Sequence, residues 1–221
     1  MEFEFVAEGF TLKKTPTSKS YYSKHKRVLI RKQKMPTEDI KKIEQEVANL
    51  KFLNHRHIVS ILDCFSDMEK QHISVVTEPL QFTLRNLING KEKPNEPLIW
   101  RAISHISDGL NYLHEQNPPI IFTDLKPEYI AGIGRFLPKV EWKLLKYCYK
   151  PPKDHFEDYI GGTACYLAPE VLRQEEVTPA ADMWSLGATI SACCNQGWDL
   201  FRSSEDVLRF LAKKLCHSMC R

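Results

Sequence analysis

The sequence predicts an α+β protein in two parts, a small antiparallel sheet followed by a mostly helical part. Three observations indicate this fold class. Short stretches rich in aromatic and β-branched residues fill the first third of the chain, one amphipathic helix interrupts them, and helical spacing of apolar residues dominates from Thr83 onward. We expect the boundary near residues 79–82, with residues 1–80 as the first lobe and 81–221 as the second.

The predicted sheet has about five strands. The first three, FEFVAEGF, KSYYSKH and KRVLIRKQ, are separated by polar residues that include Thr15-Pro16-Thr17. HIVSILDCF and HISVVTEPL have the same strand character and follow a helix. That helix is expected within PTEDIKKIEQEVANLKFLN, with Thr37 as its cap. Its apolar residues recur at helical spacing: Ile40, Ile43, Val47, Leu50 and Leu53.

The second part is predicted to be helical in four places. TLRNLI is a short helix, and LIWRAISHISDGLNYLHEQ carries an apolar stripe made of Ile99, Ala102, Ile103, Ile106, Leu110 and Leu113. ADMWSLGATISACC is apolar on nearly all sides, which is typical of a helix buried in the middle of a lobe. SSEDVLRFLAKKL begins with a Ser-x-x-Asp capping signal and predicts a last amphipathic helix.

The composition is that of a globular protein. The 221 residues are 43% hydrophobic and 27% charged, with a formal net charge of +3. The charge is uneven, because the stretch from Phe10 to Thr37 holds nine Lys or Arg and no Asp or Glu. Such a stretch suits a phosphate-rich partner, although solvated strands and a loop are the simpler interpretation.

Cysteine usage and apolar runs indicate where the chain works. The seven cysteines show no paired C-x-x-C spacing, which predicts reduced thiols in the cytosol or nucleus. Cys216-His217-x-x-Cys220 would be half of a zinc site, but no second half exists. Neither a signal peptide nor 18 apolar residues in a row are present, so we expect a soluble cytoplasmic protein, with the nucleus as the alternative.

Six motifs in order carry a resemblance to eukaryotic protein kinases. RVLIRK resembles the strand with the nucleotide-binding Lys, EQEVANLKFLNHRHIV the regulatory helix, and VVTEPL the hinge. DLKPEY resembles the catalytic loop, GGTACYLAPEVL the end of the activation segment, and ADMWSLG the buried central helix. The Lys in Asp-Leu-Lys-Pro-Glu and the Gly-Thr before the Tyr resemble the serine/threonine type. The resemblance implies a two-lobed kinase fold, here with a C-terminal lobe shortened after the helix that follows the central one.

The resemblance also implies a set of nucleotide-binding positions: Arg31, Lys32, Glu46, Thr77, Glu78 and Leu80. Arg31 stands at the family's Lys position, 15 residues before Glu46, and a register shifted by one would restore Lys32. Thr77 is the expected gatekeeper, and the hinge contacts run through the backbone. Leu29 replaces the small residue that roofs the adenine, and the first 40 residues contain one glycine, so the Gly-rich phosphate cover is missing or built differently.

The positions for phosphoryl transfer are only partly filled. Asp124 resembles the catalytic base and Lys126 the γ-phosphate contact, whereas Tyr129 stands where the family has a metal-binding Asn. The family's second metal ligand, the Asp of Asp-Phe-Gly, falls on Trp142-Lys143-Leu144, or on Lys146-Tyr147-Cys148 in an alternative register. No metal site is therefore predicted, unless Glu141, the only acidic residue between Glu128 and Asp154, is reoriented to serve.

These departures predict a pseudokinase that acts as a protein-binding scaffold or allosteric regulator in signalling. Its expected partner is a protein, with an active kinase as one candidate, and neither nucleic acid nor membrane. No cofactor is required, ATP binding is left open and Mg²⁺ binding is disfavoured. The first alternative is an atypical serine/threonine kinase that transfers the γ-phosphate of ATP by using Lys32, Asp124, Lys126 and Glu141. The second is a truncated kinase product with no independent function.

Overall fold

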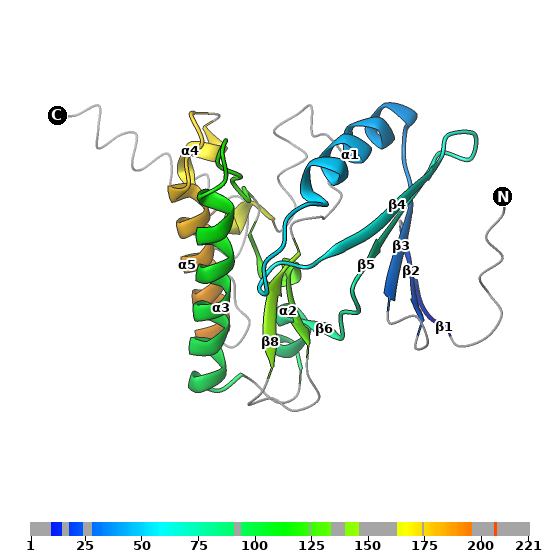
Figure 1. Cartoon of the computed structure of the whole chain (residues 1–221). Coiled ribbons are helices and arrows are strands. Elements are labelled where there is room, and N and C mark those ends of the chain that lie inside the picture. Colours follow the sequence, from blue (N-terminus) through cyan, green and yellow to red (C-terminus); the bar gives the residue numbers. More distant parts are fainter. Residues whose placement is uncertain are drawn as a thin grey trace.

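A computed structural model describes residues 10–14, 18–23, 28–90, 94–123, 125–133, 140–145, 163–173, 175–195 and 206. It confirms the α+β fold, with a sheet-rich lobe followed by a helical lobe (Figure 1). The change of character falls between β5, which ends at Thr77, and α2, which begins at Leu84. The segment of Glu78 to Gln81 therefore connects the two lobes.

The N-terminal lobe is a five-stranded antiparallel sheet in the order β1-β2-β3-β5-β4. Its strands are β1 (Phe10–Lys14), β2 (Ser18–Ser23), β3 (Val28–Lys34), β4 (Ile61–Asp67) and β5 (His72–Thr77). The prediction of about five strands is confirmed. The first described strand begins at Phe10, where the stretch FEFVAEGF ends, and residues 1–9 lie outside the described residues.

Helix α1 (Thr37–Leu50) covers one face of this sheet. Its apolar stripe is confirmed, because Ile40, Ile43 and Val47 are buried in one cluster with Ile73 and Val75 of β5. The prediction of Thr37 as the cap is wrong. Pro36 is the N-cap, and its carbonyl oxygen accepts the first helical hydrogen bonds from the backbone N–H groups of Asp39 and Ile40. Thr37 already belongs to the first turn.

The C-terminal lobe begins with β6 (Phe82–Thr83), α2 (Leu84–Ile88) and α3 (Glu96–His114). Thr83 and Asn86 form a reciprocal capping box at the start of α2, and Asn95 caps α3. Strands β7 (Ile130–Ile133) and β8 (Glu141–Leu144) extend β6 into a small antiparallel sheet. Of the predicted α3 stripe, Ala102, Ile106, Leu110 and Leu113 are buried.

Helix α5 (Ala180–Cys194) lies beside α3 in Figure 1 and is preceded by η4 (Thr163–Tyr166) and α4 (Pro169–Leu172). Eight of its residues are buried, among them Asp182, which confirms the expectation of a helix inside the lobe. Apart from Asp206, the predicted last helix SSEDVLRFLAKKL lies outside the described residues, as does Cys216-His217-x-x-Cys220. No helix in the described ranges is both long and apolar enough to cross a membrane.

The loop between α1 and β4 of the first lobe forms backbone hydrogen bonds with β8 of the second lobe. The Leu144 N–H donates to the His57 carbonyl over 2.8 Å, and the Val59 N–H donates to the Leu144 carbonyl over 2.9 Å. Helix α3 approaches this loop at Gly109, where an added Cβ would lie 2.9 Å from the His57 carbonyl oxygen. The first lobe is thus tied to β8 of the second by backbone hydrogen bonds as well as by the connecting segment.

Candidate functional site

Strand β3 carries the two candidates for the nucleotide-binding Lys position, Arg31 and Lys32. Arg31 pairs with Val75, which is buried against α1, whereas Lys32 pairs with Ser74. Because neighbouring residues of a strand alternate between faces, the position of Arg31 belongs to the α1 face and that of Lys32 to the other. Leu29 pairs with Thr77 in the same ladder. The two candidate positions for the nucleotide Lys therefore belong to opposite faces of the sheet.

The remaining predicted residues of the first lobe lie around the end of β5. Thr77 is buried, and its hydroxyl donates to the Glu78 carbonyl over 3.0 Å. Leu80 is partly buried against a small cluster of Val59, Ala131 and Leu145. Glu46, on α1, is exposed. The apolar residues on either side of it in the sequence, Ile43 and Val47, are buried.

Glu78 is the centre of a polar contact between the lobes. Its Oε1 and Oε2 each accept from Lys143 Nζ over 2.9 Å, and Oε1 also accepts from the Ser60 N–H over 2.8 Å. The side chains are 21% exposed for Glu78 and 12% exposed for Lys143, so this ion pair is shielded from water more than an ordinary surface pair. The connecting segment is thus held to β4 on one side and to β8 on the other.

The catalytic-loop positions follow a sharp bend at Thr123. Asp124 lies outside the described residues, and Lys126 immediately precedes the 3-10 turn η1 (Pro127–Tyr129). The Lys126 ammonium lies 4.5 Å from the centroid of the Tyr129 ring, within cation–π range. Lys126, the position that would hold the γ-phosphate, therefore contacts the aromatic ring that stands in place of the metal-binding Asn.

The second metal position depends on the register along β8. Trp142 is fully buried, and its ring packs edge to face with that of Phe82 at a centroid distance of 5.7 Å. Position 142 therefore faces the core, and β8 ends at Leu144, two residues before position 146 in the sequence. This geometry favours the register with Lys146-Tyr147-Cys148 at the motif, which lies outside the described residues.

Glu141, the one acidic alternative for the metal, is engaged elsewhere. Its Oε1 lies 3.6 Å from Nε of Arg56, which belongs to the loop between α1 and β4. Within the described ranges, no three His, Cys, Asp or Glu side chains are grouped so that they could hold a metal ion. The described part of the site therefore offers cations and aromatic groups where a kinase needs carboxylates.

The support beneath the catalytic loop is complete. Asp182 is fully buried, and its carboxylate accepts from the backbone N–H groups of Phe122 and Thr123 over 2.8 Å each. His114 Nε2 lies 2.7 Å from the same carboxylate. Thr123 has a φ of 66°, a left-handed conformation that costs free energy in a residue with a β-carbon. Asp182 thus holds the bend that leads into Asp124.

Two contacts that the sequence did not suggest join this support to the activation segment. Arg85 of α2 donates through Nε to Glu128 Oε1 over 2.8 Å and through Nη2 to the Tyr166 hydroxyl over 2.6 Å. The Ser185 hydroxyl of α5 donates to the Tyr166 carbonyl over 2.7 Å. The segment of residues 164–167 therefore packs against α5. Arg85 carried no signal, because a single Arg in TLRNLI looks like any exposed helix residue.

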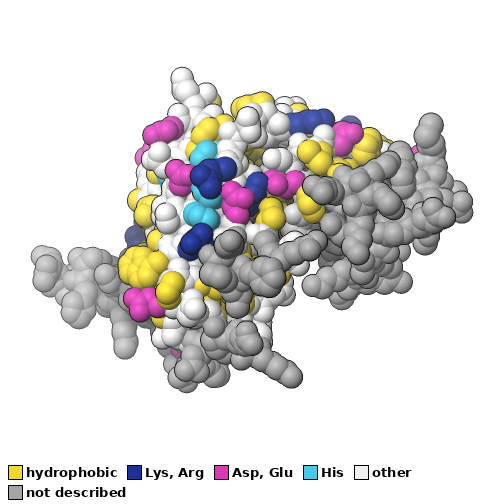
Figure 2. Space-filling model, turned by 60° about the horizontal axis from the view of Figure 1, so that its bottom comes forward, with side chains coloured by type: hydrophobic (Ala, Val, Ile, Leu, Met, Phe, Trp, Pro, Cys, Tyr) yellow, Lys and Arg dark blue, Asp and Glu magenta, His cyan; other side chains and the backbone are white. Residues whose placement is uncertain are grey.

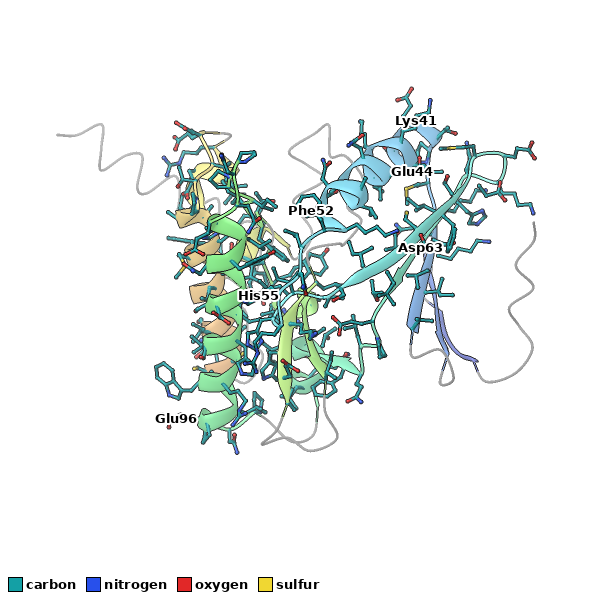
Figure 3. All side chains as sticks on the ribbon, in the orientation of Figure 1. Lys41, Glu44, Phe52, His55, Asp63 and Glu96 are labelled. Atoms are coloured by element: carbon teal, nitrogen blue, oxygen red, sulfur yellow. The ribbon has the colours of Figure 1, made fainter. Side chains whose placement is uncertain are left out.

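Histidines form the other feature that sequence reasoning missed. His57 Nδ1 donates to the Trp142 carbonyl over 3.0 Å, and the Trp142 N–H donates to His105 Nδ1 over 3.1 Å. The two rings are stacked with centroids 4.1 Å apart, and His55 stacks on Tyr112 of α3. Figure 2 shows histidine side chains beside basic and acidic ones in the middle of one face, and Figure 3 labels His55 next to α3. The spacing His55-Arg56-His57 was the available signal.

Burial controls the charge of these rings. It lowers the pKa of His57, although the hydrogen bond to Trp142 opposes the shift. It lowers the pKa of His105 to about 4, with the neighbouring His57 as the next cause. Because His105 Nδ1 accepts a hydrogen bond from a backbone N–H, that nitrogen must be unprotonated, which agrees with the direction of the shift.

Comparison with known proteins identifies the family. A sequence model of the protein kinase domain matches residues 7–216. The chain is 31% identical over 182 residues to serine/threonine-protein kinase D3 of Homo sapiens, a match that covers 81% of this chain and 20% of that protein. It is 31% identical over 162 residues to the putative mitogen-activated protein kinase 14C of Drosophila melanogaster, covering 70% and 43%. MAP3K epsilon protein kinase 1 of Arabidopsis thaliana is 34% identical over 165 residues, covering 69% and 11%.

The chain belongs to the eukaryotic protein kinase family, and its relatives are serine/threonine protein kinases. It spans less than half the length of each of these three relatives. The fold and the family are therefore those that the six motifs indicated.

Proposed function

We propose that this chain is a pseudokinase that acts by binding another protein, as a scaffold or as an allosteric regulator of a partner. The observation that carries the proposal is the contact between Lys126 and Tyr129. A kinase needs a metal ligand at the position of Tyr129, and at the position of Lys126 it needs an ammonium that can contact the γ-phosphate. Here one substitution removes the ligand and also supplies the ring on which the ammonium lies. The free thiols of Cys64, Cys193 and Cys194 support a cytosolic or nuclear setting.

The contrast between chemistry and scaffold supports the same proposal. The buried carboxylate of Asp182, the bend at Thr123 and the Arg85 contacts are those of an intact fold. The described positions that would serve the nucleotide and its metal carry the cation–π contact of Lys126 with Tyr129 and an ion-paired Glu141. A chain that keeps the kinase fold but lacks the residues that bind the nucleotide and its metal is suited to binding another protein through its surface.

The first test is the thermal unfolding midpoint with ATP alone, Mg²⁺ alone and both. A ligand that binds only the folded chain must raise this midpoint. We expect ATP with Mg²⁺ to stabilise no more than ATP alone, and no phosphate to be incorporated into a protein substrate from radiolabelled ATP. A metal-dependent rise in the midpoint, with phosphate incorporation that Asp124→Asn abolishes, would instead establish an atypical serine/threonine kinase.

A matched pair of variants tests the contact itself. Tyr129→Phe keeps the ring and should leave the response to ATP unchanged. Tyr129→Asn removes the ring that the Lys126 ammonium contacts, so ATP alone should stabilise this variant more than it stabilises the wild-type chain. Equal responses of the two variants would show that the contact does not control nucleotide binding.

A further inference from the structure

Arg85 connects three segments that are far apart in the sequence. It belongs to α2, and its Nε donates to Oε1 of Glu128 in η1 over 2.8 Å. Its Nη2 donates to the hydroxyl of Tyr166 in η4 over 2.6 Å. The Arg85 side chain is 16% exposed, and Tyr166 is buried. One guanidinium therefore contacts the turn of the catalytic loop and the end of the activation segment at the same time.

The shape of the guanidinium makes these two contacts depend on each other. Its N–H donors lie in one rigid plane, so a rotation that changes one hydrogen bond also changes the other. Both bonds have a charged donor, and such bonds are stronger than bonds between neutral groups. A displacement of Glu128 should therefore alter the donor that reaches Tyr166.

Glu128 depends on Arg85 because its second oxygen is unsatisfied. Oε2 is buried and accepts no hydrogen bond from the described residues. A carboxylate in such a position is costly once its cation is removed. The side chain as a whole is 42% exposed, so Glu128 can lower this cost by turning toward water. Loss of Arg85 should therefore move Glu128, and the turn η1 with it.

Both turns carry a second contact that reports their position. Turn η1 also contains Tyr129, and the Lys126 ammonium lies 4.5 Å from the centroid of its ring. In η4, the Leu167 N–H donates to the Ala164 carbonyl over 3.3 Å. This backbone bond is long, so its amide should exchange readily when η4 loosens.

We propose that Arg85, Glu128 and Tyr166 form a latch that couples the position of η4 to that of η1. While the latch is closed, the end of the activation segment stays on the helical lobe and η1 keeps Tyr129 beside Lys126. A partner that displaces either turn loosens the other, because coupling between two sites is reciprocal. The latch goes beyond the proposed function and does not require it. ATP binding tests that function, whereas hydrogen exchange tests the latch.

The test is amide hydrogen exchange of the full chain, measured by mass spectrometry. Glu128→Ala should raise the exchange rate of residues 164–167 about tenfold, the effect expected when one hydrogen bond from a charged group is lost. Arg85→Met keeps most of the side-chain length and should raise this rate at least as much. Addition of Glu128→Ala to Arg85→Met should then have no further effect on residues 164–167, because the connection is already broken.

Ser185→Ala is the matched control. The Ser185 hydroxyl donates to the Tyr166 carbonyl over 2.7 Å, so its loss should also speed exchange in residues 164–167. This effect should be equal in the wild-type and Arg85→Met backgrounds, because it does not pass through the guanidinium.

Two results would overturn the latch. One is an effect of Glu128→Ala that is confined to residues 126–130, and the other is an effect on residues 164–167 that persists in full in the Arg85→Met background. If Arg85→Met does not fold, Tyr166→Phe removes one oxygen atom and breaks the same hydrogen bond. Glu128→Ala must then lose its effect on residues 164–167 in the Tyr166→Phe background.

Discussion

At the scale of single residues, Asp182 shows how one buried side chain can determine a functional loop. Its carboxylate satisfies two backbone N–H groups at the bend and approaches His114, while Thr123 adopts a φ of 66°. A buried carboxylate is costly unless it is fully hydrogen-bonded, and here its bonds stabilise a strained backbone. The bend into the catalytic-loop position therefore depends on a residue 58 positions later in the sequence than Asp124.

Replacement of Asp182 by Ala should therefore destabilise the fold strongly. Two buried N–H groups would lose their acceptors, at a cost of about 1–3 kcal/mol each. We expect a total of roughly 3 kcal/mol or more in the free energy of unfolding, measured by urea titration, and a smaller loss for Asp182→Asn, which keeps one oxygen acceptor. Glu176→Ala, at an exposed position, is the control; a similar loss in that variant would contradict the argument.

At the scale of elements, the connecting segment between the lobes is fixed by strands on both sides. Glu78 accepts from Ser60 at the start of β4 and from Lys143 in β8. This arrangement joins three segments that are distant in sequence through one carboxylate. It ties the connecting segment to one strand of each lobe.

A double-mutant cycle on Glu78→Gln and Lys143→Met should reveal this coupling. Lys143→Met alone leaves the half-buried Glu78 carboxylate without its cation. This substitution should therefore destabilise the wild-type chain more than it destabilises the Glu78→Gln variant. We expect a coupling free energy of about 1–2 kcal/mol in urea unfolding, above the usual value for exposed pairs. The pair Lys51 and Asp63, whose side chains are 49% and 47% exposed, is the control and should couple weakly. Equal coupling free energies in both cycles would show that shielding from water does not strengthen the Glu78–Lys143 ion pair.

At the scale of the whole molecule, the two lobes meet at two stacked histidine rings, and burial lowers the pKa of both. His105 accepts the Trp142 N–H and stacks on His57, which donates to the Trp142 carbonyl. Arg56, Arg101, Glu141 and Asp108 also act on these rings. Protonation of His105 would remove the acceptor for the Trp142 N–H and add a positive charge near Arg56 and Arg101.

Stability should therefore fall in acid. Burial lowers the pKa of folded His105 from 6.5 to about 4, so the unfolded chain binds a proton that the folded chain does not. The stabilisation is fully present above about pH 6.5, decreases as the pH falls through this interval, and is lost below about 4. His57 acts in the same direction.

The measurement is the unfolding midpoint as a function of pH. His105→Asn keeps an acceptor near the Nδ1 position but cannot be protonated, so its profile should be flatter than that of wild type between pH 6.5 and 4. Parallel profiles for the two proteins would assign the acid sensitivity to other groups.

Much of the fold could be predicted, because the relevant patterns are local. The stripe in α1, the alternation of β5 and the all-apolar α5 each reflect burial, and burial acts on every turn or every second residue. The helix start at Pro36 was missed because Thr is a common cap, whereas here the Pro36 carbonyl already accepts the first helical bonds. The contacts of Arg85 and of the histidines were missed because they join residues that are far apart in the sequence.

The sequence by itself determined the family and the order of the elements, since these depend on motifs read along one chain. Only the tertiary structure decided that Lys126 contacts the ring of Tyr129 and that Glu78 binds Lys143. The physical reason is that the energy of a charge depends on its neighbours in space. Strand register and lobe packing, not sequence spacing, determine those neighbours.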